Sequence, residues 1–278
     1  MTPTLCSLAM GLFLGATAPE ARDVLGEIEA VHQKLFDQVA PSVAFIRSSE
    51  GFGSGFFVGQ DGLILTNNHV VKDCKTVDVV LHDGRALKGT VVERALENVD
   101  LALVRVPSPR VPAAQLSGVK GLQVGSWVGS IGHGGGAVWT FNTGMVSNVY
   151  IDGSERPVFQ TQIPLNPGNS GGPIFDRHGR VVGIVTAGIT QANAINFSIS
   201  MDLAFRTLPS LAAAADLLLI LAPPGVPVFV NDVMAGKGPR VVVAAKKGAS
   251  YAVFAVVDGQ IVRAEAKFPE VREVALKR

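Results

Sequence analysis

The sequence has 278 residues, of which 17% are charged, and a formal net charge of +1. This length is enough for one large domain or two unequal ones with a sizeable core. A charged fraction below the usual ~25%, together with abundant Val, Ala, Leu and Gly, suits β-barrels with short turns more than helical or disordered chains. Because the net charge is near zero and the sequence has no Lys/Arg cluster, binding to nucleic acid is not expected. The sequence also has no Cys/His cluster at metal-ligand spacing, so no metal or other cofactor is expected.

The N-terminal segment, residues 1–18, contains an apolar stretch at residues 5–16 followed by the small-x-small triplet Ala16-Thr17-Ala18. This pattern is typical of an export signal, which places the protein in the periplasm or cell envelope. No Lys or Arg precedes the stretch, so a buried N-terminal helix is the alternative. Residues 19–40 then repeat apolar side chains at a helical period that ends at Pro41, and this predicts a lead-in helix.

The middle of the chain changes to short β-rich runs. Between residues 43 and 106 these runs are separated by turns such as Asp61-Gly62 and Asp83-Gly84, as expected of a first barrel. Residues 107–112 form a proline-containing connection. A second series of runs, within residues 124–199, predicts a second barrel.

The C-terminal part has a different pattern. Residues 202–222 favour a helix, so a helix and linker are expected at residues 209–224. From residue 225 to residue 278, Val- and Ala-rich runs alternate with turns that contain Asn-Asp, Gly-Lys-Gly-Pro, Lys-Lys-Gly and Asp-Gly. This alternation predicts a small antiparallel, sandwich-like β domain.

The segment NPGNSGGP, residues 166–173, places Ser170 between glycines that leave room for a reacting carbonyl group. Gly168 can adopt backbone angles closed to other residues, and the amide N–H groups of Gly168 and Ser170 can then converge on a developing oxyanion. The segment is therefore interpreted as the nucleophile loop of a serine protease. The alternative is a Gly- and Asn-rich turn between two strands.

Two partners for such a nucleophile lie upstream. His69 follows an apolar run in TNNHVV, and Asp100 begins the apolar run DLALVRV. Each alone is more often a structural, turn or cap residue. The order His69, Asp100, Ser170 is that of chymotrypsin-like double barrels, whereas subtilisins and α/β-hydrolases have other orders. We therefore expect the three side chains to meet in a cleft between the two barrels.

Six stretches resemble the successive motifs of the HtrA/DegP family in order and spacing: GSGFFV (53–58), DGLILTNNHVV (61–71), DLALVRV (100–106), VGSWVGSIG (124–132), TGMVS (143–147) and QTQIPLNPGNSGGPIFD (160–176). The resemblance implies an all-β fold of two six-stranded antiparallel barrels at residues 41–208. It implies that His69 is the general base, Asp100 its orienter and Ser170 the nucleophile, with the amides of Gly168 and Ser170 as the oxyanion hole. Unfolded or misfolded proteins would be the substrates. Assembly into a homo-oligomer is left as an open alternative.

Two segments depart from the family's common pattern, namely Gln162-Ile163-Pro164 and His133-Gly134. Neither lies in the triad. By analogy, the substrate pocket is walled by uncharged residues: Thr186, Ala187, Gly188, Ile195, Asn196 and Phe197. A small or medium apolar side chain is the expected occupant. The alternative is that these residues only complete a barrel strand.

The layout of residues 225–278 resembles a PEGA-type β module, and the sequence has no Gly-Leu-Gly-Phe-like loop of the kind found in PDZ domains. An envelope component is the partner considered for this module. Two other function classes stay open. One is a peptide-binding chaperone with little turnover, and the other is an envelope adaptor in which the protease is ancillary.

Overall fold

In the computed structural model the described residues are 23–59, 61–96, 98–107, 110–119, 121–136, 139–149, 158–186 and 196–277. They form two closed six-stranded antiparallel barrels, preceded by a helix and followed by two further β-sheets. The predicted all-β double-barrel fold is thus confirmed. The expected signal segment, residues 1–18, lies outside the described residues.

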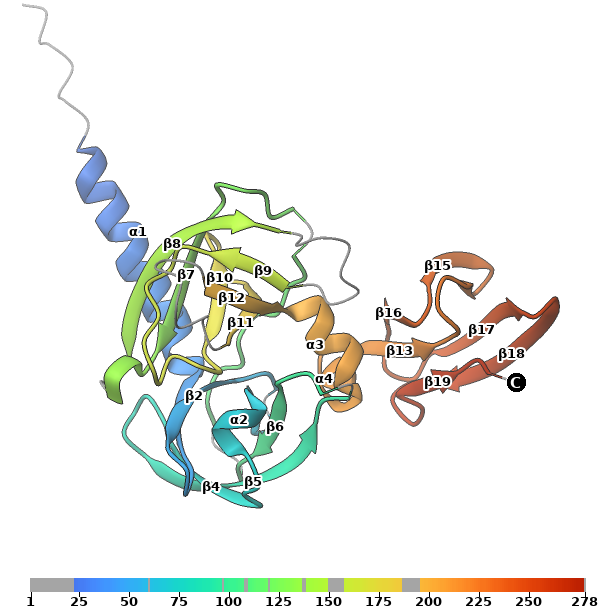
Figure 1. Ribbon diagram of the computed structural model, residues 1–278, viewed down its shortest axis with the longest axis horizontal. Helices are drawn as coiled ribbons and strands as arrows, with labels where there is room; N and C mark the ends of the chain where they lie inside the picture. Colours follow the sequence, from blue (N-terminus) through green and yellow to red (C-terminus); the bar gives the residue numbers. More distant parts are fainter. Residues whose placement is uncertain are drawn as a thin grey trace, which may run out of the picture.

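Helix α1 (Val24–Val39) precedes the barrels and runs beside the second one (Figure 1). Asp23 caps it, because its Oδ1 accepts a hydrogen bond of 2.9 Å from the Gly26 N–H. The helix ends in a short 3₁₀ turn that contains Pro41. Among its side chains, His32 stacks on Trp127 of the second barrel, with 5.5 Å between ring centroids. No helix among the described residues is long and apolar enough to cross a membrane.

The first barrel consists of β1 (Val43–Arg47), β2 (Phe52–Phe57), β3 (Leu63–Thr66), β4 (Thr76–Val80), β5 (Ala86–Arg94) and β6 (Ala102–Arg105). Its strands follow the order β1-β2-β3-β6-β5-β4 around the closed sheet. A single helical turn, α2 (Asn68–Val71), follows β3. Alternate residues of the strands point inward and fill the barrel, as the branched residues of β4, Val77 and Val79, illustrate.

The second barrel consists of β7 (Trp127–Gly132), β8 (Thr140–Asn148), β9 (Val158–Thr161), β10 (Pro173–Asp176), β11 (Val181–Val185) and β12 (Asn196–Ser200). Their order around the sheet is β10-β11-β12-β9-β8-β7. A glycine turn, η2 (Gly134–Gly136), follows β7. One apolar cluster joins the two barrels, since Phe56 and Leu65 of the first pack in it with Ile131 and Phe175 of the second.

The segment after the barrels differs from the expected helix and linker. Helices α3 (Met201–Thr207) and α4 (Pro209–Ala214) form, but Leu217–Leu221 is strand β13. Leucines favour a helix by propensity. Here Asp216 takes a left-handed φ of 55° that ends helical geometry, and β13 pairs on both edges in a sheet. The ladder bonds and burial on this sheet override the local preference, so the helix prediction for 217–221 was wrong.

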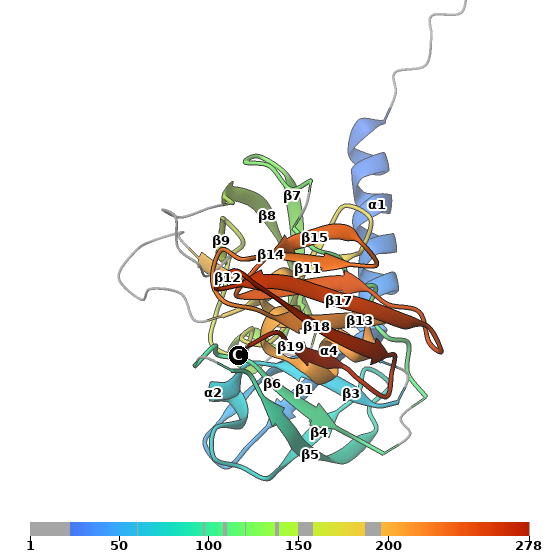
Figure 2. The ribbon, with the colours of Figure 1, turned by 90° about the vertical axis from the view of Figure 1, so that its right-hand side faces the viewer.

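The C-terminal unit contains β14 (Pro227–Val230), β15 (Val233–Lys237), β16 (Arg240–Ala244), β17 (Ser250–Val257), β18 (Gln260–Lys267) and β19 (Glu273–Ala275). These strands and β13 form a three-stranded sheet, β16-β13-β19, and a four-stranded sheet, β15-β14-β17-β18. Both sheets bury side chains in one apolar core, including Ile220 of β13 and Val253 of β17. The unit lies beside the barrels, next to α3 and α4 (Figures 1 and 2).

Candidate active site

His69 and Asp100 are brought together by the pairing of two neighbouring strands. Thr66 at the end of β3 lies opposite Ala102 at the start of β6. Because the strands are antiparallel, the residues just after β3 and just before β6 lie at the same end of the barrel. The turn α2 carries His69, and its Nδ1 lies 2.6 Å from Asp100 Oδ2. Both side chains are partly exposed, 46% for His69 and 34% for Asp100.

The Asp100 carboxylate is fixed by hydrogen bonds to both of its oxygens. The backbone N–H of His69 donates to Oδ1 at 2.9 Å, and Thr186 Oγ1 donates to Oδ2 at 3.2 Å. The side-chain amide of Asn67 donates, through Nδ2, to the backbone carbonyl oxygen of Asp100 at 2.8 Å. Since a carboxylate only accepts, His69 Nδ1 carries the hydrogen that points at Oδ2. In the neutral ring this leaves His69 Nε2 as a hydrogen-bond acceptor.

Ser170 lies in the loop between β9 and β10, and this loop packs against β2 of the first barrel. The Ser54 N–H donates to the Ser170 carbonyl oxygen at 2.8 Å. A Cβ atom added at Gly53 would lie 2.6 Å from Val70 Cγ2 and 3.1 Å from the Ser170 carbonyl oxygen. Val70, the residue after His69, and the backbone of Ser170 therefore approach Gly53 of β2 from the two barrels.

Three consecutive peptide units of this loop are held by their carbonyl oxygens. The Gly135 N–H donates to the Pro167 carbonyl at 2.7 Å, and the Gly172 N–H donates to the Asn169 carbonyl at 2.9 Å. Between them, Ser54 Oγ donates to the Gly168 carbonyl at 2.7 Å. In a planar trans peptide the N–H points away from the C=O. The N–H groups of Gly168 and Ser170 therefore point away from these anchors, and neither has an acceptor within the described ranges.

Gly168 has a φ of +101°, a region that residues with a side chain rarely adopt. A Cβ atom at this position would also lie 2.6 Å from the Phe52 ring and even closer to the His133 carbonyl oxygen. The loop can take this shape only with glycine here.

The predicted substrate-pocket residues are only partly described. Ala187, Gly188 and Ile195 lie outside the described residues. The hydroxyl of Thr186 is bonded to Asp100, a role that sequence reasoning missed. Asn196 begins β12, and its Nδ2 donates to the Ile163 carbonyl at 2.6 Å, while Phe197 is half-buried on the same strand.

A buried polar cluster behind the Ser170 loop was also missed from the sequence. It consists of Ser54, His133 and Asn169, and His133 is fully buried with its Nδ1 2.9 Å from Ser54 Oγ. The rings of Phe45 and Trp139 contact His133 edge to face, at 5.1 and 4.8 Å between centroids. Burial lowers the pKa of His133 from 6.5 to about 4. The imidazole is therefore neutral near pH 7.

This lowered pKa predicts a pH dependence of stability. Between pH 6.5 and about 4 the unfolded chain binds a proton at His133 that the folded chain does not, so the free energy of unfolding falls as the pH falls. The loss amounts to up to about 3 kcal/mol. Urea unfolding midpoints measured from about pH 7 to about pH 4 will decline less steeply for His133→Asn than for the wild type, because asparagine does not titrate. Equal slopes for the two proteins would contradict this assignment.

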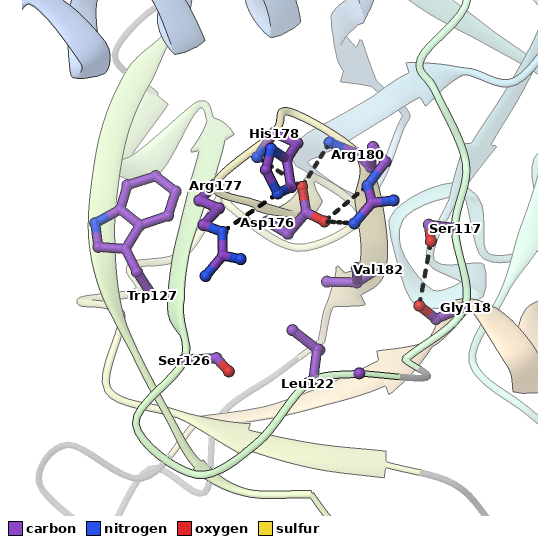
Figure 3. A pocket seen from close by; sticks show the side chains of 11 residues that line it. Ser117, Gly118, Leu122, Ser126, Trp127, Asp176, Arg177, His178, Arg180 and Val182 are labelled. Atoms are coloured by element: carbon purple, nitrogen blue, oxygen red, sulfur yellow. Dashed lines mark hydrogen bonds and ion pairs between the residues drawn. The ribbon is translucent and has the colours of Figure 1, made fainter.

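A separate cavity of about 150 Å³ lies on the second barrel beside the β10–β11 turn (Figure 3). Its charged groups bond mainly to one another. Asp176 Oδ2 accepts from Arg180 Nε at 2.9 Å and Nη2 at 2.7 Å, and Arg177 Nε donates to His178 Nε2 at 3.2 Å. We interpret these contacts as stabilising the β10–β11 turn. Across the described part of the chain, no group of three or more His, Cys, Asp or Glu side chains is placed to hold a metal ion.

Comparisons with known proteins find similar sequences and folds among peptidases. The model of the trypsin-like peptidase domain family matches residues 53–184. The "Probable periplasmic serine endoprotease DegP-like" of Halomonas elongata is 36% identical over 163 residues, which are 55% of this chain and 33% of that protein. The chain thus spans about a third of the length of this curated relative.

Solved structures show the same fold. Rv3671c from M. tuberculosis H37Rv, in an inactive form, has a TM-score of 0.60 and 25% identity, and the match covers 66% of this chain and 93% of that chain. The HtrA-type protease AlgW, solved with a decapeptide, has a TM-score of 0.59 and 21% identity, with 85% of this chain and 97% of that chain covered. At this identity the AlgW match supports the fold alone.

Proposed function

We propose that this chain, which carries a trypsin-like peptidase domain and is similar to DegP-like serine endoproteases, is itself a serine endopeptidase that uses His69, Asp100 and Ser170. The observation that carries the proposal is the 2.6 Å bond between His69 Nδ1 and Asp100 Oδ2, beside a loop in which Ser170 lies two residues after Gly168, a glycine of positive φ. A carboxylate that fixes the imidazole tautomer leaves Nε2 free to act as a base.

The chemistry is acyl transfer. Ser170 Oγ attacks the carbonyl carbon of a peptide bond while His69 Nε2 takes its proton, and the carbonyl oxygen becomes an oxyanion. The amide N–H groups of Gly168 and Ser170 stabilise this oxyanion. When the C–N bond breaks, the imidazolium gives its proton to the leaving amine and an acyl-enzyme remains. Water then attacks the ester in the same way and releases Ser170.

Polypeptides in an unfolded or misfolded state are the proposed substrates, since an extended chain is needed to reach a serine in a loop between two barrels. A small or medium apolar residue is the proposed occupant of the pocket, because Thr186, Asn196 and Phe197 carry no charge. We also propose export to the periplasm or cell envelope, which the naming of DegP-like relatives as periplasmic supports. The protease unit would be residues 41–208, with a homo-oligomer as a possible assembly and residues 225–278 as a PEGA-like module for an envelope component.

The proposal is tested by incubating the purified full chain with an unfolded model protein and sequencing the fragments, in parallel with labelling by a fluorophosphonate. Fragments that end in small or medium apolar residues, together with a label on Ser170, are the expected result. A folded chain that takes no label, even with unfolded substrate present, would overturn the enzyme assignment. It would favour the peptide-binding chaperone instead.

A further inference from the structure

Ser54 connects the nucleophile loop to a buried histidine. Its Oγ lies 2.7 Å from the Gly168 carbonyl oxygen, 3.0 Å from the His133 backbone N and 2.9 Å from His133 Nδ1. Ser54 is fully buried, so water does not replace any of these partners. A hydroxyl group has one hydrogen to donate and two lone pairs that accept. The three contacts use this capacity completely.

The direction of each of these three bonds follows from the chemistry of the partners. The Gly168 carbonyl oxygen only accepts, so it takes the single Ser54 hydrogen. The His133 backbone N–H only donates, so it uses one Ser54 lone pair. The bond to Nδ1 must then use the other lone pair, with the hydrogen on Nδ1. His133 is therefore the neutral Nδ1–H tautomer, and its buried Nε2 has no partner among the described residues.

The other tautomer would change what holds the loop. With hydrogen on Nε2, Nδ1 becomes an acceptor and competes for the Ser54 hydrogen. The Gly168 carbonyl would then lose its donor. This carbonyl belongs to the peptide unit between Gly168 and Asn169, which lies between the two units that carry the proposed oxyanion-hole N–H groups. The two outer units are anchored through their own carbonyl oxygens, by the N–H groups of Gly135 and Gly172. Since Gly168 has no side chain to restrict rotation, the Ser54 bond fixes the unit that joins them and so contributes to the orientation of the two N–H groups relative to each other.

We propose that His133 is a positioning residue for the oxyanion hole: its Nδ1–H donates to Ser54 Oγ and so directs the Ser54 hydrogen to the Gly168 carbonyl. This inference rests on the proposed protease function. His133 itself does not touch the substrate. Its ring is held for this role by edge-to-face contacts with Phe45 and Trp139, and its own backbone N–H binds the same Ser54 oxygen.

The test compares two replacements of the same shape. In His133→Asn the amide nitrogen stands as many bonds from Cα as Nδ1 and can donate to Ser54. In His133→Asp, assayed at a pH above the raised pKa that burial gives a carboxyl group, the ionised carboxylate can only accept. We expect kcat on a peptide substrate to stay within about three-fold of wild type for the asparagine variant. We expect it to fall about 10²-fold for the aspartate variant with a nearly unchanged KM, because a misplaced oxyanion donor acts on the transition state. Circular dichroism and thermal melts check the fold of each variant.

Two further measurements keep the test informative if the buried aspartate prevents folding. Ser54→Ala, which leaves the Gly168 carbonyl without its donor, is expected to lower kcat about 10²-fold, again with little change in KM. Nitrogen-15 NMR of the full chain should show a protonated Nδ1 and an unprotonated Nε2 at His133 near pH 7.

An equal loss in the asparagine and aspartate variants would mean that only the shape of the side chain matters, and it would overturn the positioning role. A hydrogen found on Nε2 would overturn it as well. If the wild-type protein neither cleaves nor labels, the proposed function fails and this role fails with it. An active wild type with an unaffected Ser54→Ala variant would refute the positioning role alone.

Discussion

Replacing Ser170 with alanine is expected to lower kcat for peptide cleavage by about 10⁶-fold, the size of effect seen when the nucleophile of a serine protease is removed. The methyl group cannot attack a carbonyl, and no other side chain of this loop between Asn166 and Pro173 carries a hydroxyl. The fold should stay intact, because the bonds that hold this position, to the Ser170 carbonyl and the neighbouring amides, come from the backbone.

The measurement is steady-state cleavage of a peptide chosen from the fragment map, with fluorophosphonate labelling alongside. Ser49→Ala is a matched control, since Ser49 is an exposed serine after β1, and among the described residues its hydroxyl has one hydrogen-bond partner, Cys74 Sγ at 3.3 Å. The control should cleave and label like the wild type. Cleavage that persists in Ser170→Ala at more than a thousandth or so of the wild-type rate would point to another nucleophile.

The strands of the barrels could be predicted because their signals are local. Short runs of branched residues ended by Asp-Gly turns mark β3 and its neighbours whatever surrounds them. Strand β13 could not be predicted in this way, since five consecutive apolar residues, Leu217–Leu221, have neither a helical nor a strand period. Its partners β16 and β19 lie later in the chain, and only their pairing decides the conformation.

The residues of the candidate site also differ in whether their signals are local in the sequence. Ser170 stands in a loop whose glycines leave room for a reacting carbonyl group. His69 and Asp100 precede it in the order typical of double-barrel proteases, so all three residues could be proposed from the sequence. The bond between Ser54 and His133 spans 79 residues. In the sequence Ser54 looks like an ordinary residue inside a strand, and His133 looks like one that follows a strand. Thr186 was read as a wall of the pocket, because nothing in the sequence shows that its hydroxyl turns toward Asp100.

Replacing Asp100 with asparagine is expected to lower kcat about 10⁴-fold although the side chain keeps its shape. The His69 backbone N–H donates to Oδ1 at 2.9 Å and can only donate, so the amide oxygen of asparagine must take the Oδ1 position. The amide NH₂ then takes the Oδ2 position and donates to His69 Nδ1. The imidazole hydrogen moves to Nε2, which can no longer accept the proton of Ser170.

Steady-state kinetics and the rate of fluorophosphonate labelling should fall together in Asp100→Asn, with KM nearly unchanged, because the asparagine alters the base and not the binding of substrate. Thr186→Val is the matched control. It removes the other side-chain bond to Oδ2 and leaves the carboxylate, so its kcat should stay within about ten-fold of wild type. If Asp100→Asn lost no more activity than Thr186→Val, Asp100 would not fix the His69 tautomer, and the base would owe its orientation to another group.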